Sequence, residues 1–248
     1  MSDGFSGIDR ELAQFLAGCI IEAYQQFSTG GEFGVPAGYR MLGPIMDGSG
    51  EQTKLYGYMI ESVAAVLIVF RGTRTVGEWL TDFDIRQVEF PYFAAGRTHS
   101  GFTELYGLLR PSILRGLQFS PHWKRVVVTG HSLGGALATL AALDIMANTL
   151  YYNLSMYNFG SPKVGDPQFA TVYDQKVQRS FRIANLFDPV PKVPPEQATL
   201  PFSHEEVTYQ HVSRTVHIFV HTGSLIQNHD IRTYLQGISG VKNNSNKK

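Results

Sequence analysis

Residues 126–135, VVVTGHSLGG, decide the fold of this 248-residue chain. The valines of 125–129 predict a short buried strand, and the Ala- and Leu-rich stretch 134–150 predicts a buried helix directly after it. The connection reads G-x-S-x-G, which places Ser132 on a sharp strand-to-helix turn where glycines avoid collisions. Such a turn exposes a serine hydroxyl near the positive end of a helix dipole. One alternative is an ordinary glycine-rich turn in which the serine caps the helix. A nucleotide-binding loop is excluded because its glycine motifs are absent.

Strand-like and helix-like segments alternate around this motif. Strands are predicted at 55–61, 64–70, 125–129, 155–159, 180–186, 208–210 and 216–220, and helices at 102–117, 134–150, 168–177 and 230–235. Pro111 is expected to end or kink the helix over 102–117. The alternation predicts an α/β fold with a mostly parallel central sheet and helices on both faces. We expect one domain over 1–240 and a disordered tail over 241–248.

The first thirty residues predict an amphipathic helix rather than a signal peptide. Apolar residues from Ile8 to Phe27 follow helical steps, Ser6 or Asp9 could cap the helix, and Gly30 would end it. Cys19 lies on the apolar stripe and is expected in the core; as the single cysteine it excludes an intrachain disulfide. These features favour a cytoplasmic protein, with a secreted chain whose signal peptide was removed as the alternative.

Charge and hydropathy exclude two classes of protein. The 21 basic and 21 acidic residues balance, so the clustered basic excess of a nucleic-acid-binding protein is missing. The longest apolar run, residues 63–70, is far shorter than the ~20 residues of a transmembrane helix. We therefore expect a globular protein with no nucleic-acid partner and no transmembrane segment.

A serine nucleophile needs a base, and in a fold of this kind the histidine follows the acid in the chain. His229 lies after the last predicted strand and before a short helix, where the base is expected. His217 and His221 share one face of a strand and are expected to be solvated, and His211 to be similarly peripheral. His131, beside the serine, is expected to be structural.

Two aspartates compete for the role of the acid. Asp188 directly follows the strand over 180–186, in a loop stiffened by prolines, and the carboxyl ends of strands gather functional groups in α/β sheets. Asp166 is the competitor, and its structural alternative is a helix N-cap before Pro167. Asp144 and Asp174 lie inside predicted helices and should not reach the site.

An oxyanion hole needs two preorganised N–H donors. The backbone of Leu133, directly after Ser132, should supply one of them. The loop FRGT, residues 70–73, follows an earlier central strand and could supply the other, with an ordinary turn as the alternative.

Together these pieces resemble the class 3 lipase family of α/β-hydrolases. The motifs are FRGT at 70–73, HSGF at 99–102, GHSLGG at 130–135, NFGSPKVG at 158–165, DPVP at 188–191, and His229 with Tyr234 five residues on. His99 and His204 match positions that look structural in the family. In two respects the chain differs from many relatives: it can form no disulfide, and it carries Asp166 where asparagine is common.

The resemblance implies roles for individual residues. It implies Ser132 as the nucleophile, Asp188 as the acid and His229 as the base. It also implies an oxyanion hole formed by Thr73 and Leu133, with Asp82 supporting the Thr73 hydroxyl. A short lid over the site would contain Val76, Trp79 and Leu80.

The expected activity is hydrolysis of acylglycerol esters through an acyl-enzyme, at a lipid–water interface, without a metal or an organic cofactor. Two alternatives on the same fold are a phospholipase A1 and a feruloyl esterase. A further alternative, from a different class, is a catalytically inactive lipid-binding relative.

Overall fold

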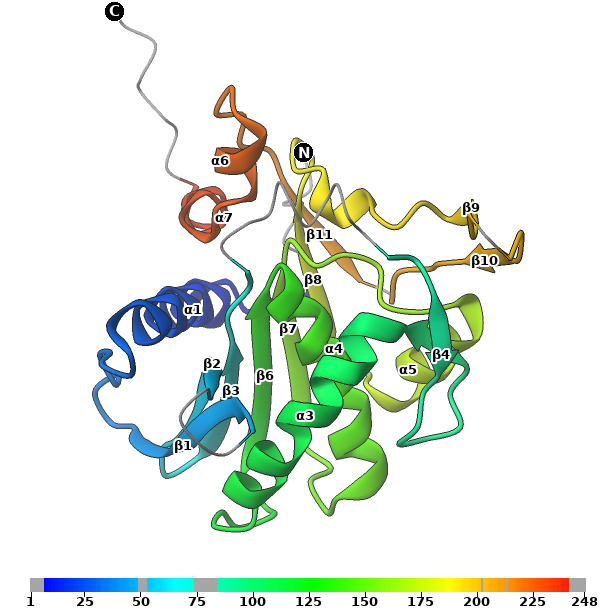
Figure 1. Cartoon of the computed structure of the whole chain (residues 1–248). Coiled ribbons are helices and arrows are strands. Elements are labelled where there is room, and N and C mark those ends of the chain that lie inside the picture. Colours follow the sequence, from blue (N-terminus) through cyan, green and yellow to red (C-terminus); the bar gives the residue numbers. More distant parts are fainter. Residues whose placement is uncertain (1–6, 49–52, 74–83, 202, 213, 241–248) are drawn as a thin grey trace, which may run out of the picture.

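The computed structural model describes residues 7–48, 53–73, 84–201, 203–212 and 214–240, with a seven-stranded sheet at its centre (Figure 1). In spatial order the strands are β1 (Arg40–Asp47), β2 (Lys54–Glu61), β3 (Ala65–Phe70), β6 (Arg125–His131), β7 (Leu154–Phe159), β8 (Ser180–Asn185) and β11 (Thr215–Ile218). β1, β2 and β3 pair antiparallel, whereas β3, β6, β7, β8 and β11 are parallel neighbours. The predicted α/β fold with a mostly parallel sheet is confirmed.

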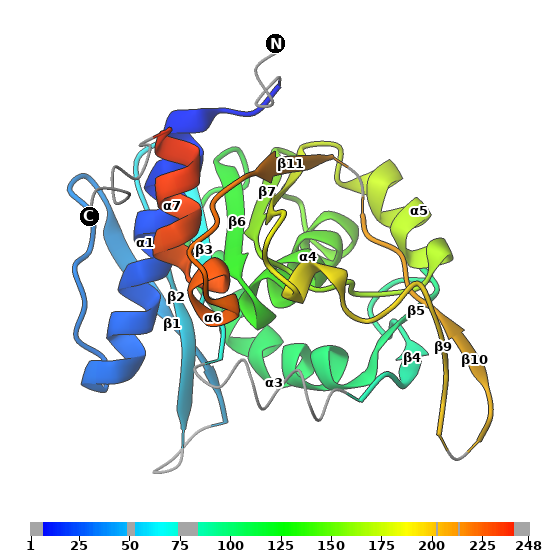
Figure 2. The ribbon, with the colours of Figure 1, turned by 90° about the horizontal axis from the view of Figure 1, so that it is seen from above.

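Helices cover both faces of the sheet (Figure 2). One face carries α3 (Ser100–Leu117), α4 (Leu133–Asn148) and α5 (Pro167–Lys176), and the other carries α1 (Arg10–Thr29) and α7 (Ile231–Ser239), which the short α6 (Leu225–His229) precedes. Within the described residues, no helix combines the length and the apolarity needed to cross a membrane.

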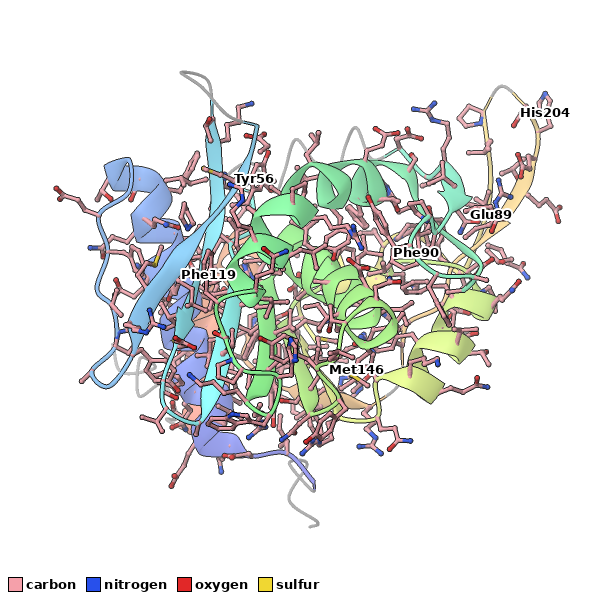
Figure 3. All side chains as sticks on the ribbon, turned by 90° about the horizontal axis from the view of Figure 1, so that it is seen from below. Tyr56, Glu89, Phe90, Phe119, Met146 and His204 are labelled. Atoms are coloured by element: carbon pink, nitrogen blue, oxygen red, sulfur yellow. The ribbon has the colours of Figure 1, made fainter. Side chains whose placement is uncertain are left out.

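The central strands are apolar on both sides because each side faces a helical layer. Val66 and Ile68 of β3 belong to the core under α3 and α4, while Leu67 and Val69 belong to the core under α1 and α7. Seen from below, side chains of the first core fill the space between these helices and the sheet, with Phe90 and Met146 at its margin (Figure 3). A run of apolar residues without alternation is the pattern of such a two-sided strand.

Several small elements lie outside the central sheet, and the two hairpins among them are at one side of the molecule (Figure 2). Two hairpins and one short 3₁₀ turn make up this set: β4 (Gln87–Glu89) with β5 (Arg97–His99), β9 (Gln197–Thr199) with β10 (Glu206–Thr208), and η1 (Val190–Lys192). These short pieces did not show in the sequence pattern, except for the end of β10.

The N-terminal helix follows its sequence prediction closely. Asp9 caps α1 by accepting a hydrogen bond from the backbone N–H of Leu12, and Gly30 ends it in the left-handed conformation. Cys19 is buried in the core, as expected. Burial raises the pKa of its thiol to about 12, so it stays protonated at neutral pH.

Two elements differ from the prediction. α3 runs through Pro111 to Leu117, so Pro111 does not end the helix; it lies on the exposed side, where water can satisfy the carbonyl that loses its partner. The edge strand β1 was not predicted, because Gly43 and Pro44 interrupt its pattern and its pairing with β2 contains register irregularities.

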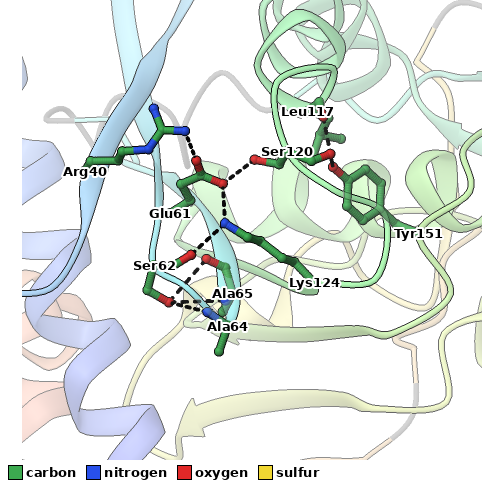
Figure 4. A network of polar contacts seen from close by, with 9 residues as sticks. All are labelled: Arg40, Glu61, Ser62, Ala64, Ala65, Leu117, Ser120, Lys124 and Tyr151. Atoms are coloured by element: carbon green, nitrogen blue, oxygen red, sulfur yellow. Dashed lines mark hydrogen bonds and ion pairs between the residues drawn. The ribbon is translucent and has the colours of Figure 1, made fainter.

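A charged network holds the lower edge of the sheet together (Figure 4). Glu61, at the end of β2, accepts hydrogen bonds from Lys124 Nζ at 2.7 Å and from Ser120 Oγ at 2.5 Å, and it pairs with Arg40. Burial alone would raise the pKa of Glu61, but the hydrogen bonds from Lys124 and Ser120 and the charges of Lys124 and Arg40 together outweigh it, and the pKa is lowered. This edge lies opposite the turn that carries Ser132.

Candidate active site

Ser132 lies between β6 and α4 in a strained backbone conformation. Its φ of 58° and ψ of −127° lie in a region that side chains other than glycine rarely adopt. The turn is so tight that a Cβ on Gly130 would lie 2.1 Å from the Gly134 carbonyl oxygen. A Cβ on Gly134 would lie 2.5 Å from the carbonyl oxygen of Arg71. Glycine is therefore required on both sides of the serine, as a nucleophile elbow demands.

Asp188 and His229 meet beside this turn. Asp188 follows β8 and His229 ends α6, and His229 Nδ1 donates a hydrogen bond to Asp188 Oδ2 at 2.6 Å. Both side chains are buried. Because Nδ1 carries the proton, Nε2 is the basic nitrogen, and among the described residues it has no hydrogen-bond partner. The pair has the form of an acid that orients a base.

Asp188 receives two further hydrogen bonds. The hydroxyl of Tyr234, on α7, donates to Oδ2 at 2.5 Å, and the backbone N–H of Val190 donates to Oδ1 at 2.9 Å. Burial, followed by the charge of Asp188, raises the pKa of Tyr234 well above its usual value, so the phenol remains a donor. The spacing of Tyr234 from His229 is visible in the sequence, but the sequence alone gives Tyr234 no role.

The competing aspartates are engaged elsewhere. Asp166 caps α5 by accepting from the backbone N–H of Phe169 at 2.7 Å, which is the structural alternative that its position before a proline suggested. Asp144 lies buried inside α4 and pairs with Arg110 of α3. Neither carboxylate forms a hydrogen bond with His229.

The two expected oxyanion donors flank the serine. Leu133 is the first residue of α4, and Thr73 ends the loop after β3. The carbonyl of Gly72 accepts a hydrogen bond from Arg71 Nη1 at 2.7 Å. In a planar trans peptide the following N–H points the opposite way, so this bond fixes the direction of the Thr73 N–H.

The remaining sequence predictions for this loop concern lid residues Val76, Trp79 and Leu80 and the proposed support Asp82. All four lie outside the described residues. Within the described part of the chain, the Thr73 hydroxyl is buried without a hydrogen-bond partner.

A cavity of about 570 Å³ opens next to the aspartate–histidine pair. Thr73, His131 and His229 line it together with side chains from α1, such as Tyr24, and from α6, such as Ile226. Ser132 is not among its lining residues, and its volume is in the range of small-molecule sites.

His131 is more than a neighbour of the serine in the chain. Its ring lies 4.5 Å from the ring of His229, and its two nitrogens contact the Tyr24 hydroxyl and the backbone carbonyl of His229. Burial, and then the neighbouring His229, lower the pKa of His131 well below its usual value. His131 is therefore neutral at physiological pH.

The other histidines lie outside this cluster. His99 caps α3 and stacks on Phe102, and burial lowers its pKa to about 4. His204, His217 and His221 are exposed.

His211 was expected to be peripheral; it lies outside the cluster, but it is half-buried rather than solvated. It contacts the Pro191 carbonyl at 2.6 Å beneath the loop that follows Asp188, and burial lowers its pKa to about 3. Its hydrogen-bond partner lies 20 residues earlier in the chain, so no local pattern marked it as half-buried.

The fold and this cluster define an α/β-hydrolase: a strained serine between a central parallel strand and a helix, an acid after a later strand, and a histidine after the last one. The family described as Lipase (class 3) matches residues 67–198. The chain belongs to the class 3 lipase family.

Individual relatives support this assignment. A lipase of Rhizomucor miehei is 36% identical over 156 residues, which are 60% of this chain and 42% of the relative. A secreted mono- and diacylglycerol lipase of Fusarium solani is 34% identical over 134 residues, 52% of this chain and 39% of the relative. The chain thus matches about two fifths of the length of these curated relatives.

Solved structures give the same fold. The triacylglyceride lipase of Rhizomucor miehei superposes with a TM-score of 0.67 at 24% identity, covering 85% of this chain and 80% of that one. A lipase of Rhizopus microsporus superposes with a TM-score of 0.65 at 22% identity, covering 91% and 85%.

Proposed function

We propose that this chain is a serine ester hydrolase that cleaves acylglycerols. Membership of the class 3 lipase family supports the reaction, and the names of the matched fungal relatives, lipase and mono- and diacylglycerol lipase, support the substrate class. The observation that carries the proposal is the buried Asp188–His229 hydrogen bond beside a serine on a strained turn.

The proposed reaction has two halves. Ser132 Oγ attacks the ester carbonyl while His229 Nε2 takes its proton, and Asp188 stabilises the imidazolium that forms. His229 returns the proton to the leaving alcohol, and the acyl group stays on Ser132. Water then attacks the acyl-enzyme with the same assistance, releasing the fatty acid and restoring the serine. The N–H groups of Leu133 and Thr73 would bind the oxyanion in both halves.

A labelling experiment tests the nucleophile. A serine-directed phosphonate should label Ser132 alone, and Ser132→Ala should lose on the order of a millionfold in turnover while keeping its fold. Labelling at another residue, or an active Ser132→Ala variant, would contradict the mechanism.

A substrate series tests the substrate class. Acylglycerols of increasing chain length would be compared with a phosphatidylcholine and a feruloyl ester. The phospholipid belongs in the series because a chloroplastic phospholipase A(1) of Arabidopsis thaliana is 34% identical over 151 residues, 52% of this chain and 33% of that relative. Preference for the phospholipid or the feruloyl ester would replace the acylglycerol proposal. Absence of all hydrolysis, together with binding to lipid vesicles, would favour an inactive lipid-binding relative.

A further inference from the structure

Three hydrogen bonds connect the oxyanion loop with the base through helix α1. The backbone N–H of Gly72 donates to the Tyr24 hydroxyl oxygen at 3.0 Å. That hydroxyl lies 2.8 Å from His131 Nδ1, and His131 Nε2 lies 2.6 Å from the backbone carbonyl oxygen of His229. Four segments that are far apart in the sequence are thereby joined by one chain of hydrogen bonds, called the line below.

The protons in this line can be assigned atom by atom. A carbonyl only accepts, so His131 Nε2 must carry a proton and donate it to the oxygen of His229. A neutral imidazole then has an acceptor at Nδ1, so the Tyr24 hydroxyl donates to it. The oxygen of Tyr24 keeps a lone pair for the N–H of Gly72. Every donor in the line meets an acceptor, with no polar atom left over.

The charge states agree with this assignment. Burial raises the pKa of Tyr24, which keeps the phenol protonated, and burial lowers the pKa of His131, which keeps its imidazole neutral. A charged His131 next to His229 would oppose the imidazolium that forms during the reaction. The neutral tautomer avoids this repulsion.

Gly72 is held tightly where it meets Tyr24. A Cβ at this position would lie 2.4 Å from the Tyr24 hydroxyl and 2.8 Å from Ser132 Cβ. Its N–H is bound by Tyr24 and its carbonyl by Arg71, so both polar groups of the residue are fixed. The peptide that carries the Thr73 N–H therefore has little freedom to rotate.

We propose that Tyr24 is a positioning residue of this site, holding the Thr73 N–H through Gly72 and the backbone of His229 through His131. The inference rests on the proposed ester hydrolysis. It assigns a role in the active site to helix α1, which lies outside the residues 67–198 that match the family. Because both attachments depend on one hydroxyl oxygen, removing that oxygen should loosen the oxyanion loop and the base together.

The test compares Tyr24→Phe with a matched control, Tyr58→Phe. Tyr58 also uses its hydroxyl to bind α1, donating to the Cys19 carbonyl at 2.8 Å, but it lies away from the site. Tyr24→Phe loses the two hydrogen bonds of its phenol and Tyr58→Phe loses one, and in both variants the lost bonds tie α1 to the rest of the fold. Tyr58 is not among the residues that line the cavity beside His229, so only Tyr24→Phe should change catalysis.

Turnover, Michaelis constant and inhibition by a trifluoromethyl ketone are measured for both variants, normalised to the number of sites that a phosphonate titrates. We expect Tyr24→Phe to lower kcat about tenfold with KM within about twofold, since one supported oxyanion donor is weakened and not removed. Affinity for the ketone, which forms an oxyanion-like adduct on serine, should fall in parallel. Unchanged kcat in Tyr24→Phe, or an equal loss in Tyr58→Phe, would overturn the inference.

A second measurement does not depend on activity. Nitrogen NMR of the histidine rings should show His131 protonated at Nε2 and unprotonated at Nδ1, and Tyr24→Phe should speed hydrogen exchange of the Gly72 amide. The opposite tautomer, or unchanged exchange, would also overturn the inference. If the unaltered protein hydrolyses no ester while these NMR results hold, the proposed function fails and the hydrogen-bonded line stands.

Discussion

Two buried aspartates in this protein each accept a hydrogen bond from a tyrosine, but they differ in their basic partner. Asp144 accepts from the Tyr106 hydroxyl at 2.6 Å, and Asp188 accepts from the Tyr234 hydroxyl at 2.5 Å. The next partner of Asp144 is the guanidinium of Arg110, at 2.7 Å.

The corresponding partner of Asp188 is an imidazole, that of His229. Arginine is always charged, so the carboxylate of Asp144 is neutralised permanently and ties α4 to α3. Histidine gains a charge only when it accepts a proton, so the carboxylate of Asp188 interacts most strongly at that moment. The difference between an arginine and a histidine separates a structural carboxylate from the one that we propose to be catalytic.

The sharpest test of this comparison is Asp188→Asn. The amide cannot stabilise an imidazolium and favours the wrong tautomer of His229, so turnover should fall on the order of 10⁴-fold. Steady-state kinetics with a soluble short-chain ester would measure the loss, and thermal unfolding would check that the fold remains. A loss below about tenfold would remove Asp188 from the triad.

The same change at Asp144 should lower stability and leave turnover nearly unchanged. Asp144→Asn leaves the Arg110 charge without its partner, which should lower the free energy of unfolding by about 3 kcal/mol. Urea denaturation measures this directly. At urea concentrations below the unfolding transition, we expect kcat of the variant to stay within about twofold of the unaltered protein. A large fall in kcat would contradict a purely structural role for Asp144.

Glu61, a third buried carboxylate, extends the comparison to pH. Its pKa is lowered from the usual 4.5, so the folded protein binds a proton there less readily than the unfolded chain does. The stability that Glu61 contributes is present above pH 4.5 and is lost as the pH falls further. Glu61→Gln should therefore flatten the fall of unfolding free energy below pH 4.5, by up to about 1.4 kcal/mol per pH unit. An unchanged slope would contradict the pairing with Lys124 and Ser120.

The two tyrosines provide a matched pair of smaller changes. Tyr234→Phe removes a donor that holds Asp188 in place, and we expect kcat to fall about tenfold, within the range seen for groups that orient a reactive residue. Tyr106→Phe removes the equivalent donor from Asp144 and should cost about 1 kcal/mol of stability with kcat unchanged. Equal effects of both variants on kcat would show that the phenols act only through stability.

The smallest effect is expected at the rejected competitor. Asp166→Asn should leave kcat within about twofold and barely change stability, because asparagine caps a helix about as well as aspartate. Thermal unfolding and steady-state kinetics check both points. A loss as large as that of Asp188→Asn would reopen the assignment of the acid.

Much of the fold was predictable because its signals are local. The valines of β6, the glycines around Ser132 and the cap at Asp9 each act within a few residues. The expected order of serine, acid and histidine also singled out Asp188 and His229, which the structure brings into contact. β1 escaped prediction because an edge strand with Gly43 and Pro44 lacks a clear pattern.

The parts of the site that were missed depend on contacts between distant segments. The role proposed for Tyr24 depends on its contacts with residues 72 and 131, and nothing near residue 24 in the sequence indicates them. Tyr234 follows His229 by five residues, a spacing that the sequence shows, but only its hydrogen bond to Asp188 indicates what it does. The partial burial of His211 was missed for the same reason.

The pairing of α1 with α7 has a consequence for how the protein is made. Arg10 Nε, near the start of α1, donates to the Ile238 carbonyl of α7 at 2.5 Å, and the two helices share one core. On a ribosome, α1 appears about 200 residues before α7, a delay of roughly 10–40 s at usual rates of synthesis. β2 and β3 follow α1 closely in the chain and can cover part of its apolar stripe early, but the part that packs against α7 stays uncovered until this last helix is made.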